Sequence, residues 1–295
     1  MADTTRELAL GGWQRVKTAG ADQPPVYLAV APPASVNIGL VVGNEGCLVV
    51  DTGSSPAQGR AIRAAVAEVT DLPIAGVVVT HAHFDHFFGL AGFYGVESYG
   101  HESLRDRLTD AGLAHVTAGL GFDAAELVAP SRQLVVAAAV DLGGVRVEIA
   151  HLGRGHTEGD LIVTVSTGTA PVVVFAGDLV ETAGPPWFGT DARPFEWPGT
   201  LDGVLGLLGP TTLLVPGHGE VVTRDPVFAQ RGEIGAVAGE IQRLMESGIV
   251  LADAAEEGRW PFPAGNIADC LPPTYAMLAS RGVRQTRSTL PLVEL

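Results

Sequence analysis

A cluster of histidines directly follows a run of β-branched residues in the segment VVVTHAHFDHFFGL, residues 77–90. The β-branched run favours a buried strand. His81, His83, Asp85 and His86 then fall at the end of that strand. The chain has only 8 histidines among 295 residues, so three of them within six positions are not a chance occurrence. Imidazole nitrogen and carboxylate oxygen are ligands of Zn²⁺ and similar ions, so the segment predicts a metal site at a strand end.

The segments around the cluster predict alternating strands and helices. Residues 38–55 read as two buried strands joined by a tight turn at residues 43–46. Residues 56–70 have the composition and spacing of a helix, and residues 74–83 read as a third strand. A strand, a helix and a strand in this order predict a right-handed parallel crossover.

The second half of the chain repeats this design. Residues 161–178 read as two apolar strands around a turn, and the second ends in Asp178 as the earlier one ends in Asp51. Residues 211–219 then form an apolar strand that runs into His218. The repetition predicts an internal duplication in which each half is a sheet covered by helices, which is an α/β fold.

The length and composition predict one domain over residues 1–295. We expect its motif-bearing core at about 25–225 and a helical, proline-rich extension at about 226–295, whose last forty residues wrap around the body. Further expected elements are a short strand at 96–99 and helices at 102–111, 201–208 and 227–247.

Candidate ligands for a second metal ion are present elsewhere in the chain. His81 and His83 are two positions apart and can project to the same side of a strand, whereas Asp85 and His86 face a neighbouring point. This spacing predicts two ions rather than one. The additional candidate ligands, all at strand ends or in glycine-rich turns, are His156 in GRGHTEGD, Asp178 in VFAGD and His218 in VPGHG.

Together, these motifs resemble the metallo-β-lactamase fold superfamily. The resemblance implies a four-layer αββα sandwich whose two sheets meet at the metal-bearing edge. The residues that carry it are Asp51 in VVDTG, His81, His83, Asp85 and His86 in THAHFDH, His156 in GHTEGD, Asp178 in FAGD and His218 in PGHG.

The resemblance also implies roles for these residues. One metal ion would be held by His81, His83 and His156, the other by Asp85, His86 and His218, with Asp178 bridging the two. Asp85 and Asp178 are then the catalytic carboxylates, and Asp51 orients the ligands. The implied cofactor is a pair of Zn²⁺ ions, with iron or manganese as alternatives, and the implied reaction is hydrolysis by a metal-bridging hydroxide.

Departures from relatives narrow the substrate class. Asp178 makes the ligand set similar to those of glyoxalase II and the lactonases, which predicts a small ester, thioester, lactone or amide as substrate. However, lactonases of this kind typically have a tyrosine where this chain has Glu181, and no residues match those by which glyoxalase II binds glutathione. The alternatives are a β-lactamase-type amide hydrolase, a mononuclear iron enzyme similar to persulfide dioxygenases, and a non-catalytic protein that retains the fold.

The loop at residues 179–200 concentrates aromatic side chains between prolines in a chain with only 6% aromatic residues. It is either a lid over the substrate or a cover of the sheet edge, and the sequence leaves both open. As substrate-binding residues we expect Trp187, Phe188 and Glu181.

The charge balance restricts the partners. The formal net charge is −15 and Lys17 is the only lysine, which disfavours nucleic acid and anionic membranes and leaves a small-molecule substrate. A homodimer is left open. The first twenty residues contain acidic Asp3 and Glu7 and do not read as a secretory signal, so we expect a cytoplasmic protein.

The remaining histidines and cysteines have no motif of their own. We expect structural roles for His101, His115 and His151, with His151 within reach of the metal ligands' surroundings. Cys47 and Cys270 are expected to be buried free thiols.

Overall fold

The computed structural model describes residues 10–19 and 23–283, so residues 1–9 and 20 of the segment in which no secretory signal is expected lie outside the described residues. The first half contains β1 (Gln14–Arg15), β2 (Val26–Ala31), β3 (Val36–Val42), β4 (Cys47–Val50), α2 (Pro56–Ala65), β5 (Ile74–Val78), α3 (Phe84–Phe87), β6 (Ser98–His101), α4 (Leu104–Arg107), α5 (Leu113–Gly119) and β7 (Arg132–Leu134). The second half contains β8 (Ala137–Asp141), β9 (Arg146–Ala150), β10 (Ile162–Ser166), β11 (Val173–Glu181), α6 (Trp197–Leu207), β12 (Leu213–His218), α7 (Arg224–Glu246), α8 (Leu251–Glu257) and α9 (Leu271–Ser280).

The strands pair in the order β7-β6-β5-β4-β3-β12-β11-β10-β9-β8, with β2 on the other edge of β3 and β1 on β2. The two expected sheets are therefore linked by hydrogen bonds, although β3 and β12 pair only through Val36 and His218. This single link forms because β12 ends in His218 exactly where β3 begins, at the edge where the two halves meet.

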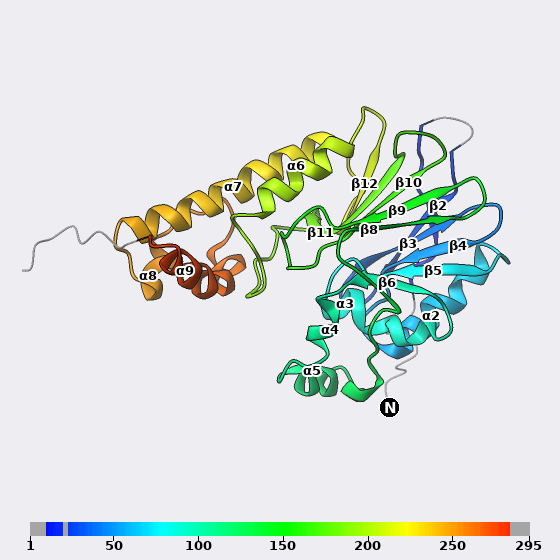
Figure 1. The fold of residues 1–295 in the computed structure, drawn as a ribbon, viewed down its shortest axis with the longest axis horizontal. Coiled ribbons are helices and arrows are strands. Elements are labelled where there is room, and N and C mark those ends of the chain that lie inside the picture. The colour runs from blue at the N-terminus through cyan, green and yellow to red at the C-terminus, as the bar shows by residue number, and fades with distance from the viewer. Residues whose placement is uncertain (1–9, 20–22, 284–295) are drawn as a thin grey trace, which may run out of the picture.

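Three clusters of buried side chains separate four layers. Ile38 on β3 packs with α2 and α3, whereas Val41, on the opposite face of the same strand, packs against the second half. Phe175 on β11 fills the space between the two halves, and a Cβ on Gly39 of β3 would overlap its ring. The third cluster lies between β11 and β12 and the helices α6 and α7. The order helix, sheet, sheet, helix confirms the predicted αββα sandwich (Figure 1).

Each half consists of an antiparallel hairpin followed by a parallel strand. β3 and β4 are antiparallel and β5 is parallel to β4, while β10 and β11 are antiparallel and β12 is parallel to β11. The helix α2 makes the first crossover and begins where the Ser55 hydroxyl accepts the amide of Gln58. The predicted duplication is thus present, and it brings the ends of β5 and β12 to the same edge.

The C-terminal extension differs from the sequence expectation. Instead of wrapping around the body, the described part forms α8 and α9, which pack against α7 and extend away from the sheets (Figure 1). Leu271, Tyr275 and Leu278 form one buried face of α9, because a spacing of four and three residues places them together. The prolines of this helix lie in its first turn, where proline is tolerated. The helix expected at 102–111 is also shorter, since only α4 forms there.

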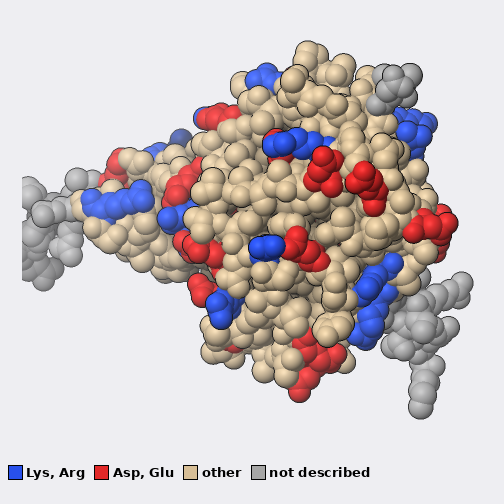
Figure 2. All heavy atoms as spheres, turned by 45° about the vertical axis from the view of Figure 1, so that its right-hand side comes forward, with Lys and Arg blue, Asp and Glu red and all other residues tan. Residues whose placement is uncertain are grey.

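The described surface carries charges of both signs, and both cysteines lie in the interior. On the face shown in Figure 2, basic side chains are interspersed with acidic ones. Among the described residues, no helix has both the length and the apolar character needed to span a membrane. Cys47 and Cys270 are buried and free, which confirms the expectation for both.

Candidate metal centre

The seven candidate ligands come from five segments and meet at one edge of the sandwich. His81 and His83 follow β5, and α3 then contributes Asp85 and His86. The other three are His156 in the turn between β9 and β10, Asp178 within β11, and His218 at the end of β12. The fold therefore brings together every residue that the sequence predicted as a metal ligand.

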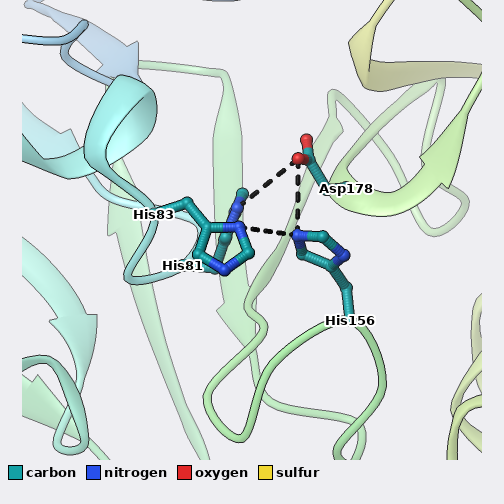
Figure 3. A group of neighbouring side chains, drawn as sticks. All are labelled: His81, His83, His156 and Asp178. Carbon is teal, nitrogen blue, oxygen red and sulfur yellow. Dashed lines mark hydrogen bonds and ion pairs between the residues drawn. The ribbon is translucent and has the colours of Figure 1, made fainter. Parts of the chain in front are cut away.

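The first group consists of His81, His83, His156 and Asp178, whose ligand atoms all lie within 4.8 Å of one another (Figure 3). His83 Nδ1 lies 2.8 Å from His156 Nε2. Asp178 Oδ2 lies 3.4 Å from His156 Nε2 and 3.6 Å from His81 Nε2. Three imidazole nitrogens and one carboxylate oxygen thus point at a common centre, which is a donor set suited to zinc.

The second group consists of Asp85, His86 and His218. His86 Nε2 lies 3.4 Å from His218 Nε2, which is itself 3.3 Å from Asp85 Oδ2. Asp178 reaches this group as well, because its Oδ1 lies 3.2 Å from His86 Nε2. One carboxylate therefore stands between the two groups.

The electrostatics of the cluster favour a cation at its centre. Burial opposes a charge on His86, yet the carboxylates of Asp178, Asp51 and Asp85 raise its pKa well above the ordinary value. Burial also lowers the pKa of His218, but Asp85 and Asp178 outweigh it and raise that pKa to about 9. The carboxylates would be neutralised by metal ions as readily as by these protons.

Two buried atoms provide a direct test of whether the site fits a metal. His81 Nε2 is buried and has no hydrogen-bond partner among the described residues, and the buried Asp178 Oδ1 has only the 3.2 Å contact with His86 Nε2. A buried polar atom without a partner is rare, since it costs about 1–3 kcal/mol. Both atoms face the cluster, so the residues present fit bound metal ions.

A hydrogen-bonded carboxylate fixes two of the imidazoles. Asp51 is buried, and its Oδ2 accepts a hydrogen bond of 2.8 Å from His86 Nδ1. Its Oδ1 accepts the Thr80 amide at 2.8 Å, and both oxygens contact the Thr80 hydroxyl. That hydroxyl lies 3.1 Å from His81 Nδ1. With their Nδ1 atoms held in this way, His81 and His86 both present Nε2 to the cluster.

Glycine is required beside Asp178. A Cβ on Gly217 would overlap Asp178 Oδ1, so only glycine lets β12 pass the carboxylate at this point. Gly177 has φ of +51°, and a Cβ there would lie 2.8 Å from the Thr80 hydroxyl. The glycines in FAGD and PGHG thus have a packing reason as well as a conformational one.

Asp191 and Thr80 contact metal ligands but were not predicted from the sequence. Asp191 Oδ2 lies 3.2 Å from His83 Nε2, on the ring side opposite the cluster, and its pKa is lowered to about 2 because His83 outweighs the effect of burial. Thr80 directly precedes the histidine motif in the sequence, so its position could have indicated a role beside the metal ligands. Asp191 lies in the aromatic loop, and nothing in its neighbours marks it.

The three predicted substrate-binding residues have different surroundings in the structure. Trp187 is 50% exposed, whereas Phe188 is fully buried and packs against Trp197 with ring centroids 4.9 Å apart. The structure therefore places Phe188 in the core, because its neighbours form the cluster under α6. Glu181 lines a cavity of about 570 Å³ beside α7, and burial raises the pKa of its carboxyl. Its carboxylate also accepts the amide of Ala183 at 2.7 Å.

An αββα sandwich with two histidine and aspartate groups at the junction of its halves defines a class of metal-dependent hydrolases. The chain belongs to the metallo-beta-lactamase superfamily, whose family model matches residues 31–218. This match spans all seven candidate ligands together with Asp51.

Individual relatives agree with this assignment. The chain is 28% identical over 193 residues to the "Metallo-beta-lactamase type 2" of Bacillus cereus, which covers 63% of this chain and 68% of that protein. A shorter match of 81 residues, 33% identical, covers 25% of this chain and 15% of the "Linear primary-alkylsulfatase" of a Pseudomonas species. The solved structure "Metallo-beta-lactamase from Pontibacter korlensis" shares the fold, with a TM-score of 0.55 and 18% identity, covering 75% of this chain and 98% of that one.

Proposed function

We propose that this chain is a dinuclear zinc hydrolase that acts on a small ester, thioester, lactone or amide. The observation that carries the proposal is the position of Asp178. Its carboxylate lies 3.2 to 3.6 Å from imidazole nitrogens of both groups. A carboxylate in this position can be shared by two ions.

When bound, a pair of divalent ions supplies a water that ionises near neutral pH and stabilises the charge that develops on a carbonyl oxygen. The side chains provide the geometry. Asp51 and Thr80 hold His81 and His86, and Asp191 holds His83, so the imidazoles are oriented before any substrate arrives. We propose that Trp187, exposed on the loop that carries Asp191, contacts the apolar part of the substrate.

The test is a substrate panel with metal quantification. Purified protein of known metal content is assayed against lactones, thioesters, aryl esters and β-lactams. We expect two zinc ions per chain and hydrolysis of at least one ester class, and we expect both to be lost in Asp178→Asn and His83→Ala while each variant still unfolds cooperatively. Asp202→Asn is the matched control, since that carboxylate is exposed and paired with Arg231 on the surface. Unchanged turnover in metal-free protein, or a single redox-active iron per chain, would contradict the proposal.

A β-lactam is the second candidate substrate, because the similarity to the Bacillus cereus protein extends over 193 residues. The aspartate at position 178 favours esters instead, since many true β-lactamases have cysteine or serine at this position. Hydrolysis of a β-lactam without turnover of lactones or thioesters would show that the substrate is a β-lactam and not an ester.

We also propose a cytoplasmic location for the chain. Cys47 and Cys270 are free thiols, which is the usual state of cysteines in a reducing compartment. Fractionation of cells that produce the chain tests this proposal.

A further inference from the structure

A second pair of histidines lies outside the two groups that form the candidate metal centre. His101 ends β6 in the first half, and His151 directly follows β9 in the second half. Their ring centroids are 4.5 Å apart, with an angle of 38° between the rings. The sequence predicts a structural role for each residue separately, but it does not predict that they meet.

Both rings are held in a fixed orientation. His151 Nδ1 donates to the carbonyl oxygen of Asp160 at 2.9 Å. His101 Nδ1 lies 2.9 Å from the hydroxyl of Ser103 and 3.3 Å from its amide. Gly159 packs directly on this ring, because a Cβ there would lie 2.6 Å from His101 Nδ1. These contacts engage both Nδ1 atoms and leave both Nε2 atoms available.

The two histidines border the same space. Both histidines line an open cavity of about 660 Å³, together with the carboxylates of Glu102 and Glu158. In the part of the chain that the structure describes, neither Nε2 atom has a hydrogen-bond partner. His101 is only 8% exposed, and burial together with the neighbouring His151 lowers its pKa, so the ring is neutral near pH 7. A neutral imidazole is the form that binds metals.

The spacing of the pair matches that within the candidate metal centre. His83 and His156, which point at a common centre, have ring centroids 4.5 Å apart, and His81 lies 4.8 and 4.9 Å from these two rings. The rings of His101 and His151 are therefore as close as two rings of that centre, although they are tilted by 38° instead of standing at 86° as those of His83 and His156 do.

We propose that His101 and His151 bind a divalent transition-metal ion such as Zn²⁺ or Cu²⁺ through their Nε2 atoms, at a peripheral site distinct from the candidate metal centre. Water completes the coordination. On binding, the proton of neutral His101 resides on Nδ1, where the Ser103 hydroxyl accepts it, and the longer contact to the Ser103 amide is given up. Arg105 and Arg154 also line the cavity. The charge of Arg154 is offset by Glu158 at 3.3 Å and Glu196 at 3.7 Å, and Asp106 lies in the lining beside Arg105.

Such an ion would join the two halves of the sandwich. His101 belongs to the first half, and His151 precedes the turn that carries His156. Binding to the folded state alone stabilises a protein in proportion to the logarithm of ligand concentration. We therefore expect the thermal midpoint to rise with free zinc beyond the concentration that fills the candidate metal centre.

The experiment counts zinc in the untagged chain by equilibrium dialysis against a series of zinc buffers, raised until the count is constant. We expect His151→Gln and His101→Gln each to bind one zinc fewer than the wild-type chain. The control His115→Gln, an exposed histidine on α5, should bind the wild-type number. The ring of His101 packs on Gly159, so its substitution can disturb the local structure. His151 is partly exposed, and its substitution tests the site without disturbing this packing.

Two results would overturn the inference. One is an equal zinc count in His151→Gln and His115→Gln, and the other is a wild-type count that never exceeds the number held by the candidate metal centre. The readout is a difference between variants and does not use hydrolysis. A failure of the proposed function would therefore change the total count but not this difference.

Discussion

Replacing Asp51 by asparagine tests how the chain orients its imidazoles. Asp51 accepts hydrogen bonds from His86 Nδ1 and from the Thr80 amide, each at 2.8 Å. Asparagine has one oxygen and one NH₂ group in place of two oxygens. Whichever way it is placed, its NH₂ group faces another donor, either the Thr80 amide or His86 Nδ1. The variant must therefore leave the amide unpaired or turn His86 into the tautomer with a proton on Nε2.

The backbone does not confound this substitution. Asp51 has φ of +66°, in the left-handed region that asparagine tolerates as well as aspartate. Loss of a partner that orients a metal-bound histidine typically costs about 10–100-fold in metal affinity, or about 1.4–2.7 kcal/mol. Asp51→Ala adds an unpaired buried amide at Thr80, which costs about 1–3 kcal/mol of folding free energy, and alanine is in addition strained at this positive φ.

The assay is competition for zinc between metal-free protein and a chromophoric chelator, with chemical denaturation measured in parallel. We expect Asp51→Asn to weaken zinc binding by about 10–100-fold. Asp51→Ala should, in addition, lower the free energy of unfolding of the metal-free chain. Asp202→Asn, an exposed carboxylate paired with Arg231, should change neither quantity. Zinc affinity in Asp51→Asn equal to that of the wild-type chain would refute the role assigned to this carboxylate.

Three further predictions concern the neighbourhood of the site. Gly217→Ala displaces the carboxylate of Asp178, so kcat/KM should fall by about 100-fold or more. A variant that keeps the wild-type kcat/KM would contradict this prediction. The metal-free chain should lose stability between pH 6.5 and about 9, because the raised pKa of His218 means that its proton stabilises the fold below 6.5 and is lost as the pH passes the folded value. Denaturation of chelator-treated protein across this range measures the slope, and a flat profile would count against it. Phe188→Ala should lower the free energy of unfolding by about 3–5 kcal/mol because this ring is buried. Trp187→Ala should change it by no more than about 0.5 kcal/mol because this ring is half exposed. Equal thermal midpoints in the two variants would refute the difference in burial.

Much of the fold could be predicted from the sequence because the signals are local. The apolar runs that lead into His81 and His218 mark buried parallel strands, and the repeated hairpin with Asp51 and then Asp178 near its end marks the duplication. The C-terminal extension was predicted wrongly in part. Its prolines suggested an irregular path, but Pro272 and Pro273 occupy the first turn of α9, where they do not interrupt a helix.

Some residues of the candidate site could be predicted from motifs in the sequence, whereas others could not. Motif spacing identified all seven candidate ligands, because they belong to short motifs at or near strand ends. However, β11 continues past Asp178 to Glu181 instead of ending there. Asp191 could not be found, since a single aspartate in a loop has no periodic signal and its contact with His83 depends on how the loop folds back. Phe188 and Trp187 are adjacent and similar in sequence, yet only the packing under α6 determines which is buried.

The sequence by itself determined the class of fold, the types of ligand and their order along the chain, because these depend on hydrophobic periodicity and on the chemistry of each side chain. Only the tertiary structure decided which atoms meet: that Asp178 stands between two groups, that Thr80 links Asp51 to His81, and that His101 lies against His151. The physical reason is that contacts between distant segments are set by how the two halves pack face to face, and no local pattern along the chain encodes that packing.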